Sequence, residues 1–201
     1  MLLICGMCQI VDFRLKHSLS DTLRAQDVPL LYPHCVRMGC VLPPRASAAE
    51  YDDARIGKKP VAIEVNAETR RWLLPVSRFV LIKRFSSKEE NRRLVAGVLE
   101  PESFSSELLG IENHLNFFHH RRGSLPIDAA RGLCRFLNST VADRYFRQFN
   151  GHTQVNASDL RAFRYPSLAA LSRLGNLSLD DQNQTDIDEA LTKILGAPAF
   201  S

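Results

Sequence analysis

The chain has 201 residues, of which 45% are hydrophobic and 24% are charged, and its formal net charge is +4 at pH 7. These proportions are typical of a soluble globular protein, and no repeat or low-complexity tract interrupts them. No apolar run reaches the length of a membrane-spanning helix, and residues 1–5 are too short and uncharged for a signal peptide, so we expect a cytoplasmic protein. The mild basic excess suits a polyanionic partner.

Short extended segments dominate the first 75 residues. Residues 9–15 alternate enough to predict a strand, and prolines bracket a second extended segment at 28–33. Residues 43–59 are rich in Pro, Ala, Ser, Asp and Gly, and they are predicted to form a loop. A third strand is predicted over 61–65, followed by a turn or short helix over 66–72.

A hairpin is predicted over residues 79–99, with a charged turn at 86–93. Residues 107–118 are predicted as one further strand. His119 and His120 follow it. Because neighbouring residues of a strand point to opposite faces, these two are not expected to bind a metal together.

One long amphipathic helix is predicted after the basic turn at residues 121–123. Its apolar positions recur every three or four residues, as they do in a helix with one buried face. Ser124 is expected to cap its start and Gly151 to end it. The apolar stripe comprises Ala130, Leu133, Leu137, Val141 and Tyr145.

The loop after this helix is rich in side-chain amides. Asn and Gln can donate and accept hydrogen bonds together, so they can bind the edge of adenine in two places. Asn156, with an Asp three positions later, favours instead the N-cap of a short helix over 157–162. For His152 and Gln154, a ligand contact and a structural hydrogen bond both stay open.

Two helices are predicted at the end of the chain. Ser167 is expected to cap the first, over 168–174, and Gly175 to stop it. A polar linker at 176–184 leads to the last helix, over 186–195. We expect this helix either to cover the core or to contact a partner.

The predicted fold class is α+β. A largely antiparallel sheet from the first 120 residues is expected to pack against helices from the last 80. Residues 1–175 form the predicted main domain, with a flexible loop at 43–59, and residues 176–201 form a polar linker and a terminal helix.

The five cysteines leave two interpretations open. Cys5, Cys8, Cys35 and Cys40 form two close pairs, which would supply the four thiolates of a zinc site. Their loose spacing and poor flanking residues favour reduced, partly buried thiols instead. The odd count argues against disulfides.

A family resemblance is carried mainly by the second half of the chain. It rests on the string FRQFNGHTQVNASDLRAFRYPS, with NHLNFFH and LNST upstream. These strings resemble the carboxy-terminal region of type II adenine-specific DNA methyltransferases of the TaqI-like kind. The blocks DFRLK, VPLLYP, KKPVAI, NAETRRWLLP and RFSSKEENRRLVAGV fit the same region in order, from about residue 11 to residue 175. The resemblance implies the target-recognition domain of a restriction–modification enzyme, with duplex DNA as its partner.

The resemblance also implies that the chemistry lies elsewhere. Such enzymes bind S-adenosylmethionine in an amino-terminal domain and methylate the exocyclic amine of adenine with an Asn-Pro-Pro-aromatic motif. This sequence has no such tetrapeptide, and its one Pro-Pro pair, Pro43-Pro44, follows Leu42. We therefore expect no cofactor and no methyl transfer in this chain alone. A companion catalytic domain would flip the adenine out of the stack.

The expected DNA contacts are basic, amide and hydroxyl side chains. Cations of the predicted hairpin, Arg92 and Arg93 among them, are expected to follow the phosphate backbone, although Glu89 and Glu90 weaken the positive field. An ordinary solvated surface is the alternative. The predicted DNA-binding residues are Lys83, Arg84, Ser86, Ser87, Lys88, His119, Arg121, Arg122, Asn150, His152, Thr153, Gln154 and Asn156.

Two other functions stay open. Asp52 and Asp53, ahead of Glu64, faintly match the acidic pair of magnesium-dependent restriction nucleases. Asn66, however, stands where such a site normally has a lysine. The chain would otherwise be an inactive remnant or a protein-interaction module whose recognition surface has decayed.

Overall fold

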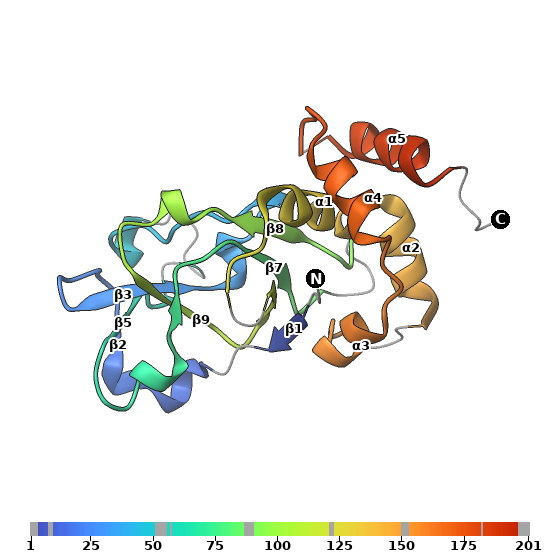
Figure 1. Ribbon diagram of the computed structural model, residues 1–201. Coiled ribbons are helices and arrows are strands. Elements are labelled where there is room, and N and C mark those ends of the chain that lie inside the picture. Colours follow the sequence, from blue (N-terminus) through green and yellow to red (C-terminus); the bar gives the residue numbers. More distant parts are fainter. Residues whose placement is uncertain are drawn as a thin grey trace.

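The computed structural model describes residues 4–7, 10–50, 56, 58–86, 91–120, 123–149, 153–181 and 183–196. Its elements confirm the α+β class (Figure 1). The strands are β1 (Ile4–Met7), β2 (Leu19–Ser20), β3 (Asp27–Leu31), β4 (Gly39–Cys40), β5 (Ala62–Glu64), β6 (Leu74–Pro75), β7 (Phe79–Lys83), β8 (Ala96–Leu99), β9 (Leu108–Ile111) and β10 (Leu115–His119). The helices are α1 (Ile127–Leu137), α2 (Thr140–Phe149), α3 (Ala157–Ala162), α4 (Leu168–Gly175) and α5 (Gln184–Leu195).

The central sheet has five strands in the order β1-β10-β7-β8-β4. β7 and β8 form the predicted hairpin, in which Phe79 lies opposite Leu99 and Ile82 opposite Ala96. β10 pairs antiparallel with both β7 and β1, whereas β4 joins β8 in parallel at the far edge. Most residues of these strands are aliphatic or aromatic, so the sheet has an apolar surface on both faces.

The second sheet has the order β2-β5-β3-β9-β6, with β3 between antiparallel β5 and parallel β9. The single strand predicted over 107–118 is wrong, because β9 and β10 belong to different sheets. The chain turns at Glu112, whose carboxylate accepts the N–H of His114 at 2.8 Å. The Glu112 carbonyl accepts the N–H of Leu115 at 3.1 Å. This turn carries the chain from one sheet to the other.

The prediction of a strand over residues 9–15 is also wrong. Ile10 forms only an isolated bridge, with Glu112, and the chain then turns through the 3-10 helix Asp12–Arg14. The Asp12 carboxylate accepts the next backbone N–H at 2.7 Å, a local bond that competes with a strand ladder. The extended segments predicted at 28–33 and 61–65 are confirmed by β3 and β5.

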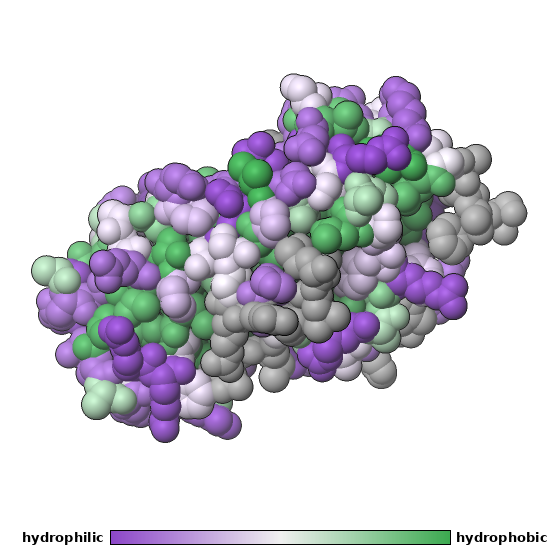
Figure 2. All heavy atoms as spheres, in the orientation of Figure 1, coloured by the Kyte–Doolittle hydropathy of each residue, from purple (hydrophilic) through white to green (hydrophobic). Residues whose placement is uncertain are grey.

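The central sheet lies between the helices and the second sheet (Figure 1). Val80 and Ile82 of β7 point into a hydrophobic cluster to which all five helices contribute. Phe79 and Leu81 point the other way, into a cluster that contains residues of β3 and β9. The alternation of side chains along a strand produces both cores. Hydrophobic and hydrophilic patches alternate over the face shown in Figure 2.

The long helix predicted from the sequence is two helices, α1 and α2, which are separated at Asn138 and Ser139. Asn138 is completely buried. Its side-chain amide accepts the N–H of Ala96 at 3.0 Å and donates to the Ala96 carbonyl at 2.8 Å. The Ser139 hydroxyl accepts the N–H of Ala142 at 3.1 Å and so starts α2. The helix therefore breaks where a buried amide binds the backbone of β8.

Two glycines allow α1 and α4 to pack in backbone contact. A Cβ atom built on Gly132 would lie 1.8 Å from the carbonyl oxygen of Leu171. One built on Gly175 would lie 1.8 Å from the carbonyl oxygen of Asp128. A side chain at either position would push the two helices apart.

The predicted helix caps are partly confirmed. The Ser167 hydroxyl accepts the N–H of Ala170 at 3.2 Å at the start of α4, and Asn156 forms the capping box of α3. The prediction that Ser124 caps α1 is wrong, because its hydroxyl accepts the N–H of Arg78 at 3.1 Å instead. Gly151, the predicted end of the long helix, lies outside the described residues.

The last helix, α5, covers the core. Its Ile187, Ala190 and Leu191 are buried, and the helix contacts α1, α2 and α4. Of the two roles left open by the sequence, the structure thus supports packing onto the helical layer. None of the helices in the described part of the chain has the length and apolarity of a bilayer-spanning segment.

Candidate nucleic-acid interface

The structure brings two parts of the predicted DNA-binding set together. Phe85, just after β7, forms an antiparallel bridge with Gln154, in the loop before α3. The Ser86 N–H donates to the Thr153 carbonyl at 3.2 Å. We call this contact between residues 83–86 and 153–155 the β7 junction. It joins segments that lie 70 residues apart in the sequence.

Arg84 adds a third segment to the β7 junction. Its Nη2 donates to Gln154 Oε1 at 3.4 Å, and its Nη1 donates to the carbonyl of Asn113 at 3.2 Å. Its backbone N–H donates to the carbonyl of His114 at 2.9 Å, and its carbonyl accepts the N–H of Val155 at 2.6 Å. Arg84 is half-buried, so it positions two loops while part of its surface stays accessible.

Phe85 is the exposed aromatic residue of the β7 junction, with 43% of its surface accessible. The ring of His114 meets it edge-on, with the centroids 4.7 Å apart and the planes at 65°. The Arg84 guanidinium carbon lies 5.6 Å from the Phe85 ring centroid. Thr153, which precedes the bridged residue Gln154, is exposed as well. The junction thus presents one apolar ring among hydrogen-bonding side chains.

A group of cations lies around His34, which follows β3 of the second sheet. The His34 ring stacks on Tyr32, with centroids 5.9 Å apart and planes at 8°. Lys59 Nζ lies 5.3 Å from the centroid of the Tyr32 ring. Burial, together with the positive charges of Arg37, Lys83 and Lys59, lowers the pKa of His34 to about 4. We call His34, Arg37, Lys59 and Lys83 the His34 group, and Lys83 connects it to the β7 junction.

Two carboxylates near the His34 group are engaged by cationic or imidazole partners. Asp12 Oδ2 lies 3.1 Å from Lys59 Nζ. Glu112 has a fully buried side chain, and its Oε1 lies 2.7 Å from Nδ1 of His114. Burial raises the pKa of Glu112. Asp12 and Glu112 therefore each have a partner within the protein.

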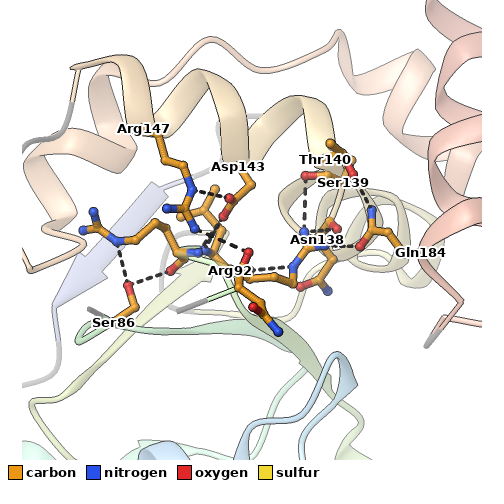
Figure 3. Close-up of polar contacts among 11 residues, drawn as sticks. Ser86, Arg92, Asn138, Ser139, Thr140, Asp143, Arg147 and Gln184 are labelled. Carbon is orange, nitrogen blue, oxygen red and sulfur yellow. Dashed lines mark hydrogen bonds and ion pairs between the residues drawn. The ribbon is translucent and has the colours of Figure 1, made fainter. Parts of the chain in front are cut away.

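Arg93 is not placed to follow a phosphate backbone, because only 1% of it is exposed. Its Nε donates to the Ser86 hydroxyl at 3.0 Å, and its backbone N–H donates to Asp143 Oδ1 at 2.6 Å. Arg147 Nε donates to the other oxygen of Asp143 at 2.7 Å (Figure 3). The prediction for Arg93 is therefore wrong. Ser86, which is 5% exposed, has its hydroxyl engaged inside the same network.

Arg92 is held by the break between α1 and α2 and by α5 (Figure 3). Its guanidinium donates to the carbonyl of Asn138, to the side-chain oxygen of Gln184 and, at 3.3 Å, to the carbonyl of Ser139. Burial lowers the pKa of Arg92. Arg92 and Arg93 therefore attach the end of the hairpin turn to the helices instead of presenting charge to a partner.

His119 lies at the opposite end of β10 from the β7 junction. Leu115 of β10 is beside Lys83, whereas Phe118 is beside Val80. His119 is only 6% exposed, and its ring stacks on Phe117 with centroids 4.9 Å apart. The predicted DNA-binding set is thus divided between two ends of the central sheet, and this histidine is engaged within the protein.

Several predicted contacts lie outside the described residues and stay predictions. They are Ser87, Lys88, Arg121, Arg122, Asn150 and His152. Asn156 is described, and its backbone N–H donates to the Asp159 carboxylate at 3.3 Å. The capping role weighed for Asn156 from the sequence is therefore confirmed, and its contact with DNA stays a prediction.

The described cysteines lie on different sides of the central sheet. Cys5 packs with the helices, whereas Cys35 packs in the core shared with the second sheet. Burial raises the pKa of Cys5 to about 12 and that of Cys35 to about 11, so both thiols are protonated at neutral pH. Among the described residues, which exclude Cys8, no group of three or more potential metal ligands is present. The interpretation as reduced thiols fits this placement.

The described residues do not show the acidic site that a magnesium-dependent nuclease would need. Asp52 and Asp53 lie outside the described residues. The side chain of Asn66 accepts the N–H of Thr69 at 2.9 Å and donates to the Ser18 hydroxyl at 3.2 Å. Asn66 therefore fixes the turn after β5.

The sequence interpretation missed four members of the candidate interface, namely Phe85, His34, Arg37 and Lys59. Phe85 was assigned to a strand, although its place between Arg84 and Ser86 is a signal, since aromatics interleaved with basic residues are typical of nucleic-acid surfaces. His34 and Lys59 gave no such signal. They come together because β3 and β5 pair within the second sheet.

No protein-family model matches the chain. It is 43% identical over 190 residues to type II methyltransferase M.BsuBI of Bacillus subtilis, an alignment that covers 92% of the chain and 36% of that protein. It is 39% identical over 188 residues to type II methyltransferase M.PstI of Providencia stuartii, covering 93% of the chain and 35% of that protein. The chain is therefore homologous to type II methyltransferases, and it spans about a third of the length of these curated relatives.

Proposed function

We propose that the chain binds duplex DNA as the target-recognition part of an adenine-specific DNA methyltransferase of a restriction–modification system. The observation that carries the proposal is the β7 junction, in which Arg84, Thr153 and Gln154 converge from segments 70 residues apart. The homology to type II methyltransferases supports the methyltransferase setting. Adenine as the target base rests on the family resemblance of the sequence.

The chemistry of the candidate interface suits duplex DNA. Arg and Lys side chains of the His34 group and Arg84 would neutralise phosphates and fix the register of the protein on the duplex. Gln154 carries the type of amide that reads an adenine edge, and the bond from Arg84 to its Oε1 orients that amide. Arg84, which would position the protein on the phosphates, and Gln154, which would read the base, are thus neighbours in space.

In this proposal, the catalytic step belongs to a companion domain. That domain would bind S-adenosylmethionine and receive the flipped adenine, while this chain holds the flanking duplex. The absence of an Asn-Pro-Pro-aromatic motif from this sequence supports such a division. The same proposal places the protein in the cytoplasm together with the DNA that it binds.

Duplex binding by the chain at increasing salt concentration tests the proposal. If about six phosphates are neutralised, the affinity should fall with a log–log slope of about −5 between about 50 and 200 mM salt. A parallel incubation with radiolabelled S-adenosylmethionine should give no methylated DNA. The absence of salt-dependent association in a chain that is folded by circular dichroism would overturn the proposal.

A further inference from the structure

Phe85 is unusual among the described residues of the candidate interface because it is a large apolar side chain that is both exposed and fixed. Single exposed hydrophobic residues are common, so its 43% exposure alone decides nothing. Its backbone, however, is bridged to Gln154, and its ring contacts both His114 and Arg84. The ring is therefore held in one orientation before any ligand arrives.

The surroundings of the Phe85 ring are polar. Arg84, His114 and Gln154 carry hydrogen-bonding groups, and the exposed Thr153 adds a hydroxyl. The junction thus offers one fixed apolar spot within a surface that can donate and accept hydrogen bonds. A ligand that matches it has one apolar group set among polar ones.

The major groove of DNA has that composition. Its base edges carry hydrogen-bond donors and acceptors, and the apolar group that they display is the C5-methyl of thymine, which phenylalanine is suited to contact. We propose that Phe85 contacts a thymine methyl group in the DNA target and so contributes to sequence selection. This inference rests on the proposed DNA-binding function and adds a residue and a base to it.

Insertion of Phe85 between base pairs is disfavoured by the same geometry. A wedge residue has to enter the stack with both ring faces covered by bases. The ring of Phe85 already has the guanidinium of Arg84 at 5.6 Å and the ring of His114 at 4.7 Å, and more than half of the residue is covered. The part of Phe85 that stays exposed suits a contact with a group on the edge of a base.

The experiment begins with selection of duplexes from a random pool by the wild-type chain. Each thymine of the enriched sequence is then replaced by uracil, which removes only the methyl group. At one position, uracil should weaken binding to the wild type by about fourfold, the factor expected for one buried methyl group. For Phe85→Ala, the thymine and uracil duplexes should bind equally.

The matched control is Phe13→Ala. Phe13 is 64% exposed and also has its neighbouring arginine, Arg14, against its ring, at 5.7 Å. This variant should keep the preference of the wild type for thymine. Phe85→Leu, which retains an apolar side chain, should keep part of it. Thermal unfolding of all variants verifies that they are folded.

Three results would overturn the inference while leaving DNA binding intact. In the first, uracil weakens binding equally in the wild type and in Phe85→Ala. In the second, no uracil substitution affects the wild type. In the third, a 2-aminopurine beside the site brightens on binding in the wild type but not in Phe85→Ala, which identifies a wedge. No enrichment and no salt-dependent binding would instead refute the proposed function, and the inference with it.

Discussion

Asp143 of α2 accepts the backbone N–H of Arg93 at 2.6 Å, although the two residues are 50 positions apart. The same carboxylate oxygen accepts the N–H of Leu94 at 3.0 Å. Arg147 donates to the other oxygen from one helical turn later. A single carboxylate thus attaches the segment before β8 to the helical layer. Ser86 belongs to the β7 junction, and Arg93 Nε donates to its hydroxyl. The attachment at Asp143 therefore also helps to hold the β7 junction in place.

Asp143→Ala should lower the free energy of unfolding by about 2–4 kcal/mol. The change leaves two buried N–H groups without their acceptor and Arg147 without its ion-pair partner. Asp143→Asn keeps one acceptor oxygen and should recover part of the loss. Urea unfolding measures both. Glu102→Gln is the control, because its carboxylate is 75% exposed and should contribute less than about 0.5 kcal/mol. Equal losses at Asp143 and Glu102 would contradict the prediction.

Elements that depend on neighbouring residues could be predicted from the sequence. The cap of α4 by Ser167 and the β7–β8 hairpin are confirmed, since each rests on turn or capping residues close in the chain. The break between α1 and α2 was missed because Asn138 binds Ala96, 42 residues earlier. Helical periodicity continues across such a break and so gives no warning of it.

The candidate interface could be predicted only in part for the same reason. Arg84 and Gln154 were predicted from residue type and from the family resemblance, and the structure brings them together. Arg93 has the same side-chain chemistry as Arg84, but its guanidinium is buried and donates to the Ser86 hydroxyl, while its backbone N–H donates to Asp143. A single sequence does not distinguish a cation that faces a ligand from one that is buried by residues distant in the chain.

Lys83→Ala and Arg37→Ala should each reduce the log–log salt slope of duplex binding by about 1. Both cations lie close enough to His34 to lower its pKa. The loss should be similar for all DNA sequences, because phosphate contacts carry no base information. Arg173→Ala removes an exposed cation from α4 and is the matched control. An unchanged slope for both interface variants would place the phosphate contacts elsewhere.

Gly132→Ala should destabilise the protein by about 3 kcal/mol or more, since the new Cβ would lie 1.8 Å from a backbone oxygen of α4. The clash cannot be relieved by a side-chain rotation because both partners are backbone atoms of packed helices. Gly123→Ala is the control, where the nearest atom to a new Cβ lies 3.3 Å away. Thermal unfolding should show a much larger fall in the midpoint temperature for Gly132→Ala than for Gly123→Ala. Similar midpoints for the two variants would be inconsistent with the close packing of α1 on α4.

The free energy of unfolding should fall as the pH is lowered from 6.5 to 4, and His34 should account for part of this fall. The pKa of His34 is lowered to about 4 from an ordinary value of 6.5, by burial and by the charges of Arg37, Lys83 and Lys59. The folded state therefore binds fewer protons than the unfolded state in this window. The contribution of His34 is fully present above pH 6.5 and is lost as the pH falls through the folded-state pKa.

His34→Gln removes this titration and should flatten the pH dependence over the same window. Because His34 is half-buried, solvent screening reduces the expected difference to about 1 kcal/mol. Urea unfolding of both proteins at intervals from pH 4 to pH 7 measures it, and subtraction of the two curves cancels the carboxylates that they share. Added duplex DNA should reduce the loss of stability of the wild type over this pH window. The reason is that phosphates near Arg37 and Lys83 offset the positive charges that lower the pKa of His34. Parallel curves for the two proteins would mean that Arg37, Lys83 and Lys59 do not lower the pKa of His34, which would contradict the prediction.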